Sequence, residues 1–127
     1  MTIRQRVTLS VLSLFLSSCA PAVKAPDLPQ SVSPGWQLNG VREKSPAAAW
    51  EGDYAGPGKA RVRIWSIHGT AEGLDRVQKW RPEANTVVFY GERYFAAVDW
   101  TGADRVQAGS LVRAIERAIG SQPDTRY

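Results

Sequence analysis

Two strand-forming runs in the second half of the chain constrain its fold most. Residues 86–90 and 94–100 consist mainly of β-branched and aromatic side chains, and only Gly91, Glu92 and Arg93 separate them. Two such runs joined by a short link that contains glycine are typical of a β-hairpin. The chain is therefore expected to contain an antiparallel pair of strands.

Residues 60–67 predict a further strand, because side chains alternate there with a period of two. One face of this strand would carry Val62, Ile64 and Ser66, and the other Arg61, Arg63, Trp65 and Ile67. Residues 36–42 alternate weakly and indicate a first strand, in which Asn39-Gly40 is a possible turn. Residues 43–58 contain Pro and Gly punctuation and are interpreted as irregular.

Two amphipathic helices are predicted, one over residues 70–80 and one that ends at Gly120. The apolar stripe of the second helix consists of Ala108, Leu111, Val112, Ile115, Ala118 and Ile119. We expect Thr70 to cap the first helix. Thr101 and Asp104 are expected to form a capping box before the second.

The order strand, helix, hairpin, helix predicts an α+β fold, a small two-layer sandwich. Its antiparallel or mixed sheet would have about three to five strands, with both helices on one face. The connection from residue 67 to residue 86 is long enough for a right-handed crossover, so the strands at 60–67 and 86–90 are expected as possible parallel neighbours. A single domain over residues 36–120 would hold these elements, followed by a loose tail at 121–127.

The N-terminus has the three-part plan of a secretory signal peptide. Arg4 and Arg6 are positively charged, residues 7–16 are mostly apolar, and small residues follow. A run of this length does not cross a bilayer, which needs about 20 apolar residues. We therefore expect residues 1–18 to be removed on export.

The motif Leu16-Ser17-Ser18-Cys19 contains the only cysteine of the chain, and it resembles the lipobox of bacterial lipoprotein precursors. The resemblance implies cleavage before Cys19 and attachment of lipid, such as palmitate, to its sulfur and amino group. It also implies a place in the cell envelope. Because Ala20 rather than Asp follows the cysteine, the outer membrane facing the periplasm is the expected site in a cell with two membranes. The alternative is an ordinary signal peptide cut near Ala20 or Ala22.

Residues 19–35 are interpreted as the lipidated cysteine and a Pro-rich tether. Prolines at positions 21, 26, 29 and 34 favour an extended chain of about 3.1 Å per residue. Without Arg4 and Arg6 the chain has 14 basic and 12 acidic residues, a net charge of +2. This mild excess, with no run of basic residues, does not indicate a nucleic-acid partner.

One face of the strand at residues 60–67 is the strongest candidate for a binding surface, because arginine beside an indole can hold an anionic or sugar-containing ligand. The candidate ligand-binding residues are Arg61, Arg63, Trp65, Tyr90, Tyr94 and Trp100. The last three belong to the surface only if the hairpin pairs alongside with these rings on the same side. The alternative is that all these side chains merely shield an open sheet face.

An enzymatic alternative depends on Glu51 and Asp53, a carboxylate pair among aromatic residues as in glycan hydrolases, and on His68 in a loop. Solvated acids and a solvated histidine are the favoured interpretation of these groups. Asp99 is expected at an exposed strand end, where it would help to begin the second helix. No cofactor or metal site is indicated, since Zn²⁺ prefers about three or four His, Cys or carboxylate ligands.

Together these patterns predict a membrane-anchored envelope lipoprotein. Acylated Cys19 would hold it to the lipid bilayer. Its domain would be a non-catalytic binding or accessory module for an envelope protein or glycan. The alternative is a small envelope hydrolase that uses Glu51 and Asp53, or His68.

Overall fold

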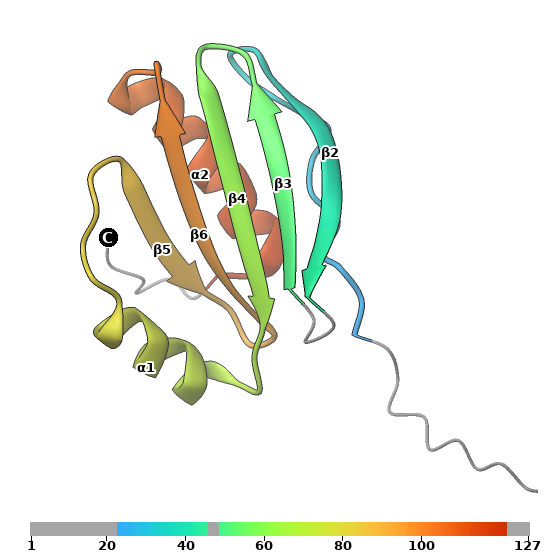
Figure 1. The fold of residues 1–127 in the computed structure, drawn as a ribbon, viewed down its shortest axis with the longest axis vertical. Coiled ribbons are helices and arrows are strands. Elements are labelled where there is room, and N and C mark those ends of the chain that lie inside the picture. Colours follow the sequence, from blue (N-terminus) through green and yellow to red (C-terminus); the bar gives the residue numbers. More distant parts are fainter. Residues whose placement is uncertain (1–22, 46–48, 122–127) are drawn as a thin grey trace, which may run out of the picture.

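The computed structural model describes residues 23–45 and 49–121 of the chain. The elements in chain order are β1 (Ser31–Val32), β2 (Trp36–Ser45), β3 (Ala49–Ala55), β4 (Lys59–Ser66), α1 (Thr70–Lys79), β5 (Thr86–Tyr90), β6 (Tyr94–Thr101) and α2 (Arg105–Ile119). Figure 1 shows them as one sheet with two helices against it. The expected signal peptide, Cys19 and the end of the expected tail lie outside the described residues.

The sheet has six antiparallel strands in the order β1-β2-β3-β4-β6-β5 (Figure 1). The α+β class, the hairpin and the strand at 60–67 are confirmed. The expected number of strands was too low. The expected parallel neighbours were also wrong, because β6 lies between β4 and β5 and pairs antiparallel with both.

The larger sheet comes from two strands that were not predicted, β1 within the expected tether and β3. Residues 49–55, interpreted as irregular, form β3, in which Trp50 and Tyr54 are buried on one face. The tempting turn at Asn39-Gly40 is a shift in strand register instead, with a positive φ at Gly40, and β2 continues through it. Gly and Asp are depleted in strands, so β3 depends on pairing with β2 and β4 rather than on its own propensity.

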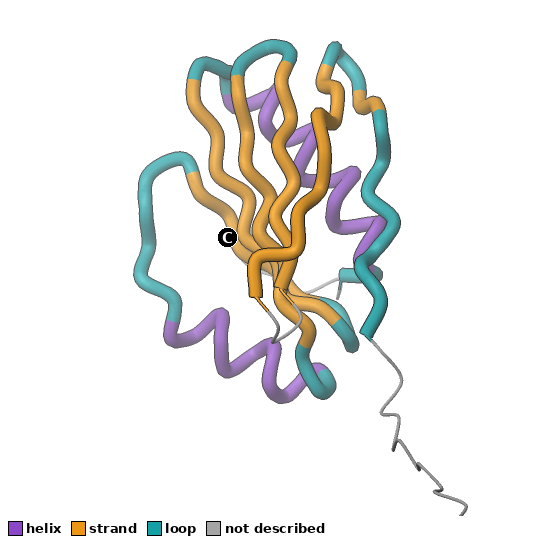
Figure 2. Tube along the Cα trace, turned by 45° about the vertical axis from the view of Figure 1, so that its right-hand side comes forward, coloured by secondary structure: helices purple, strands orange, loops and turns teal. Residues whose placement is uncertain are grey.

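The two helices cover opposite faces of the sheet, contrary to the expected arrangement on one face. The cluster beneath α2 contains Ala96 and Val98 of β6. The cluster that α1 joins through Val77 contains Ala97. Successive residues of a strand point to opposite faces, so these clusters lie on the two sides of β6. Figure 2 shows α2 running along the sheet and the shorter α1 at the end of β5.

Both helices begin with other capping groups than expected. Asp104 is the N-cap of α2 and forms the capping box with Gln107, whereas Thr101 still belongs to β6. At α1 the N-cap is Gly69, and Thr70 is the first helical residue. The predicted stop of α2 is confirmed, because Gly120 adopts the left-handed conformation there with φ 69°.

The described part of the expected tether, from residue 23 on, lies against the domain. Tyr54 donates a hydrogen bond of 2.6 Å to the carbonyl of Pro29, and Tyr94 donates one to the carbonyl of Lys24. Leu28 and Val32 pack on the core beneath α2. The folded unit therefore begins well before residue 36, because Ala25, Leu28 and Val32 are partly buried against the core.

Candidate functional site

One face of the sheet carries a network of ion pairs across β2, β3, β4 and β6. We call it the charged face, and it consists of Arg42, Lys44, Glu51, Asp53, Arg61, Arg63 and Asp99. Strand register creates it: Glu51 lies beside Arg42 on one side and Arg63 on the other, and Asp99 lies beside Arg61. Helix α1 packs mainly on β5 and β6 at one side of the sheet, so long charged side chains cover the rest of this face.

Glu51 is the centre of the charged face. Its side chain is 8% exposed and lies 3.4 Å from Arg42, 3.3 Å from Lys44 and 3.7 Å from Arg61. A carboxylate taken out of water in this way is tolerated only with partners. Asp53 accepts a hydrogen bond of 2.6 Å from Arg42, which raises the pKa of that guanidinium. Both acids of the hydrolase alternative are therefore ion-paired.

Asp99 holds the other half of the network. Its carboxylate lies 3.1 Å from the guanidinium of Arg61 and 3.3 Å from that of Arg63. The expectation that Asp99 begins the second helix was wrong, since that role belongs to Asp104. Arg61 and Arg63 are on one face, as predicted, but each is committed to a carboxylate of this chain.

An aromatic pocket adjoins the charged face where α1 meets the sheet. The cavity of about 210 Å³ is lined by Trp65, Asp75, Arg76, Lys79, Trp80 and Phe95. The Trp65 and Trp80 rings meet edge to face with centroids 6.1 Å apart, and Phe95 lies 5.5 Å and 5.6 Å from them. The guanidinium of Arg63 stacks on both indoles, at 5.9 Å and 5.6 Å. Such contacts fix a cation against aromatic faces.

Two buried hydrogen-bond donors beside the aromatic pocket have no partner among the residues that the structure describes. They are Nε of Arg63 and the indole Nε1 of Trp80. Leaving such a group unpaired costs about 1–3 kcal/mol. The outer rim of the pocket is polar, because Asp75 pairs with Lys79 at 3.1 Å and Arg76 pairs with Glu72 at 3.2 Å. An apolar floor with charged groups at its edge is the usual lining of a small ligand site.

Only one of the three hairpin residues of the predicted surface lies on this side of the sheet. Tyr90 packs with Trp65 in the cluster near α1, but its ring is pressed against Gly73 of the helix. Tyr94 and Trp100 lie on the opposite face, packed against the core beneath α2. The period-two alternation of β6 decides this, because Phe95, between Tyr94 and Ala96, points to the α1 side.

His68 is exposed just before α1 and does not line any of the cavities described here. Its backbone N–H donates to Glu72 at 2.8 Å, which lowers the pKa of that carboxyl. Within residues 23–45 and 49–121, no group of three or more His, Cys, Asp or Glu residues could hold a metal ion.

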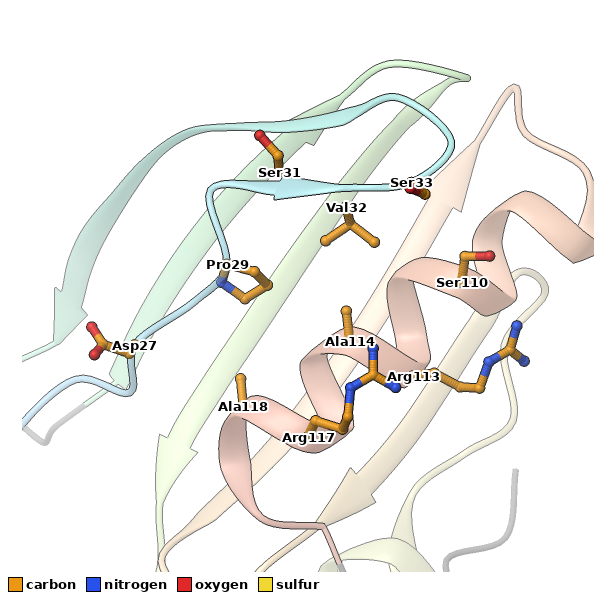
Figure 3. Close-up of a pocket in the computed structure, with 10 residues that line it drawn as sticks. All are labelled: Asp27, Pro29, Ser31, Val32, Ser33, Ser110, Arg113, Ala114, Arg117 and Ala118. Carbon is orange, nitrogen blue, oxygen red and sulfur yellow. The ribbon is translucent and has the colours of Figure 1, made fainter.

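Sequence reasoning missed two further hollows. The strand–helix groove, of about 610 Å³, lies between β1 with its preceding residues and α2 (Figure 3). It is lined by Asp27, Pro29, Ser31, Val32, Ser33, Ser110, Arg113, Ala114, Arg117 and Ala118. A third hollow, of about 760 Å³, is lined by Trp100 and by residues near the start of α2. The signal for the groove was weak, because it depends on residues before 36 being folded onto the domain.

Comparison with protein families, with curated proteins and with solved structures found no match to the chain. Among the helices within the described residues, none is long and apolar enough to cross a membrane.

Proposed function

We propose that this chain is a membrane-anchored envelope lipoprotein whose domain is a non-catalytic binding module for a glycan of the envelope. The signal-like N-terminus and Cys19 in its lipobox-like setting support the anchor. The aromatic pocket supports the binding role, and it is the single observation that carries the proposal.

The chemistry of the aromatic pocket suits a saccharide ring. The apolar face of a pyranose can stack on the indole of Trp65 or Trp80, while Asp75 and Lys79 at the rim exchange hydrogen bonds with its hydroxyls. Entry of a ligand oxygen near Trp80 would also give its unpaired indole N–H an acceptor. A cavity of about 210 Å³ is small for a drug-sized ligand, so one ring at a time would be held.

The hydrolase alternative has less support. A pair of catalytic carboxyls needs one free acid and one free base facing a cleft. Glu51 is surrounded by three cations and Asp53 is bound to Arg42, and neither lines a cavity described above.

Calorimetric titration with soluble saccharides released from the cell envelope tests the proposal. We expect saturable binding to the wild-type protein. Trp65→Ala should lose at least about tenfold in affinity, or about 1.4 kcal/mol, because it removes an aromatic surface on which the C–H face of the sugar packs. The matched control is Leu74→Ala, because Leu74 is exposed on α1 and does not line the pocket. Absence of wild-type binding, or equal affinity in Trp65→Ala, would contradict a glycan site here.

A further inference from the structure

The strand–helix groove lies on the other side of the molecule from the charged face and has its own chemistry. Figure 3 shows Pro29 and Val32 facing Ala114 and Ala118 of α2 across it, with Arg117 turned toward the strand and Arg113 directed away. The small side chains on α2 leave the hollow open. The guanidinium of Arg117 lies at its edge, whereas Arg113 lines the same rim with its guanidinium turned outward. The groove is therefore apolar along its floor and basic along the α2 rim, and Asp27 lies on the opposite wall.

The wall opposite α2 is an unpaired sheet edge. Among the strands of the described part of the chain, β1 is the outermost and pairs only with β2. The carbonyl of Gln30 accepts a hydrogen bond from the backbone N–H of Leu38 in β2. Hydrogen-bonded and non-bonded positions alternate along an antiparallel pair. The next residue, Ser31, therefore has its N–H and C=O pointing away from β2. Such outward backbone groups can pair with an added strand.

The rim of the groove has positive charge without an internal counterion. Among the described residues, neither the side chain of Arg113 nor that of Arg117 has an ion-pair or hydrogen-bond partner, in contrast to the arginines of the charged face. Four residues along a helix rise about 6 Å. Alternate residues of an extended strand are about 6.6–6.8 Å apart and point to the same side. Two acids at alternate positions of a strand therefore match the spacing of the two arginines.

We propose that the strand–helix groove binds an extended acidic segment of a partner protein, added as a further strand beside β1. The backbone of Ser31 pairs with the segment, and carboxylates at alternate positions reach Arg113 and Arg117. The lining of α2 from Ser110 to Ala118 spans about 12 Å, enough for about four extended residues. This is recognition by strand addition, in which backbone pairing gives affinity and side chains give specificity.

Fluorescence anisotropy of a labelled peptide tests the charge pattern. The probe is Thr-Glu-Val-Glu-Val-Thr, titrated with the full chain in detergent micelles; the comparison peptide, Thr-Glu-Glu-Val-Val-Thr, places its acids on opposite sides of a strand. We expect the first peptide to bind at least about tenfold more tightly than the second, and Arg117→Glu to weaken it by at least about tenfold. Arg105→Glu is the matched control, because Arg105 lies on the same helix but outside the groove, and we expect no more than a twofold change.

A second pair of variants tests the strand addition. Ser31→Pro removes the outward N–H while the bonds of Gln30 and Val32 to β2 remain, and proline is tolerated on edge strands. Ser31→Ala keeps that N–H. We expect weaker peptide binding only in Ser31→Pro, with both variants melting within a few degrees of each other.

Equal binding of the two peptides, no effect of Arg117→Glu, or equal affinity in Ser31→Pro and Ser31→Ala would overturn the proposal. Cosedimentation with vesicles of an anionic phospholipid provides the remaining outcome. A dependence of vesicle binding on Arg117, with no binding of the peptide, would identify the groove as a lipid-headgroup site instead. The glycan titration tests the aromatic pocket on the opposite face of the sheet. Its outcome is therefore independent of the outcome of the peptide experiments.

Discussion

Glu51 is the residue whose environment in the structure differs most from the one expected from the sequence. In the sequence it stands beside Gly52 and Asp53 like a loop acid, whereas in the fold it is buried among Arg42, Lys44 and Arg61. These three cations remain about half exposed, so they can be hydrated without Glu51, but Glu51 has no such alternative. Its role is to neutralise a sheet face that carries arginines instead of a helix.

Removing the charge of Glu51 should therefore destabilise the fold more than breaking a surface pair. We expect Glu51→Gln to lower the free energy of unfolding by about 1–2 kcal/mol, less than for a pair buried on both sides, because solvent screens the cations. Asp75→Asn, which breaks the exposed pair with Lys79, should change it by less than about 0.5 kcal/mol. Urea unfolding of both variants measures the difference. Equal effects would show that Glu51 does not hold the charged face together.

Tyr54 should make the free energy of unfolding fall as the pH rises through the alkaline range. Burial raises the pKa of Tyr54 from 10.0 to about 12, so between these values the unfolded chain loses a proton that the folded protein keeps. The free energy of unfolding should fall by about 2–3 kcal/mol from this group across that window. Below pH 10, the lost hydrogen bond to Pro29 should make Tyr54→Phe less stable than wild type by about 1 kcal/mol.

The difference between the two proteins should therefore change sign in the lower half of the window, once the wild-type protein has lost about 1 kcal/mol. Chemical unfolding measured at intervals from pH 9 to about pH 12 shows whether it does. Parallel curves for wild type and Tyr54→Phe would mean that Tyr54 ionises as readily in the folded protein as in the unfolded chain.

At the residue scale the sequence identified faces but not partners. The alternation of β4 correctly places Arg61, Arg63 and Trp65 together. It does not reveal that Asp99 lies opposite Arg61, because that pairing depends on β6 lying beside β4. Tyr94 and Trp100 were assigned to this face without that register, and they lie on the other side.

At the element scale, α1 is held to the sheet by a close approach that only glycine allows. A Cβ on Gly73 would lie 2.4 Å from Cδ2 of Tyr90 and 2.7 Å from its Cβ. The near end of the tyrosine side chain cannot swing away as a flexible tip could. The helix therefore lies directly on β5, and Gly73 is its buried residue.

Gly73→Ala should destabilise the protein although alanine is the better helix former. Overpacking against Tyr90 costs about 1–3 kcal/mol, which outweighs the gain in helix propensity of about 1 kcal/mol. Gly109→Ala in α2 is the matched control, because its nearest neighbour would be a guanidinium nitrogen of Arg113 at 3.5 Å. There we expect a gain of about 0.5–1 kcal/mol. Thermal unfolding distinguishes the two, and a stabilised Gly73→Ala would show that α1 can move away from β5.

Elements with strong local patterns were predictable, and those that depend on neighbours were not. The hairpin β5–β6 and helix α2 carry their own periodicity and turn residues. Strand β3 also alternates, with Trp50 and Tyr54 on one face and Glu51 and Asp53 on the other. Gly52 and the flanking prolines concealed that alternation, because local propensity was weighed above period.

At the scale of the whole molecule, the two helices lie on opposite sides of the sheet, and each side has its own candidate binding site. The α2 side is closed by the helix and by residues 24–32, which leaves the strand–helix groove at their junction. The α1 side is only partly covered, so the charged face and the aromatic pocket remain accessible beside the helix. Strand β6 is buried on both of its faces, in agreement with helices on opposite sides of the sheet. The order of the elements along the chain does not indicate this arrangement.

The anchor would hold this arrangement close to the bilayer rather than far from it. Val23 is the first described residue and the chain folds onto the domain from Lys24 on. Only three residues lie between Cys19 and Val23, so the Cα atoms of these two residues are at most about 14 Å apart. A lipidated Cys19 therefore implies a domain lying near the membrane surface, within reach of ligands and partners there.

Labelling cells with an alkyne analogue of palmitate tests the anchor itself. We expect label in the wild-type protein and a mature chain that begins at Cys19. Two or more acyl chains on that residue would hold a small domain stably at a bilayer. Cys19→Ala should lose the label completely, whereas Ser18→Ala should keep it, since a small residue still precedes the cysteine. Mass spectrometry of the mature N-terminus gives the cleavage site independently of the label. An unlabelled wild-type chain cut near Ala20 or Ala22 would show that the segment is an ordinary signal peptide, and the domain would then act without a lipid anchor.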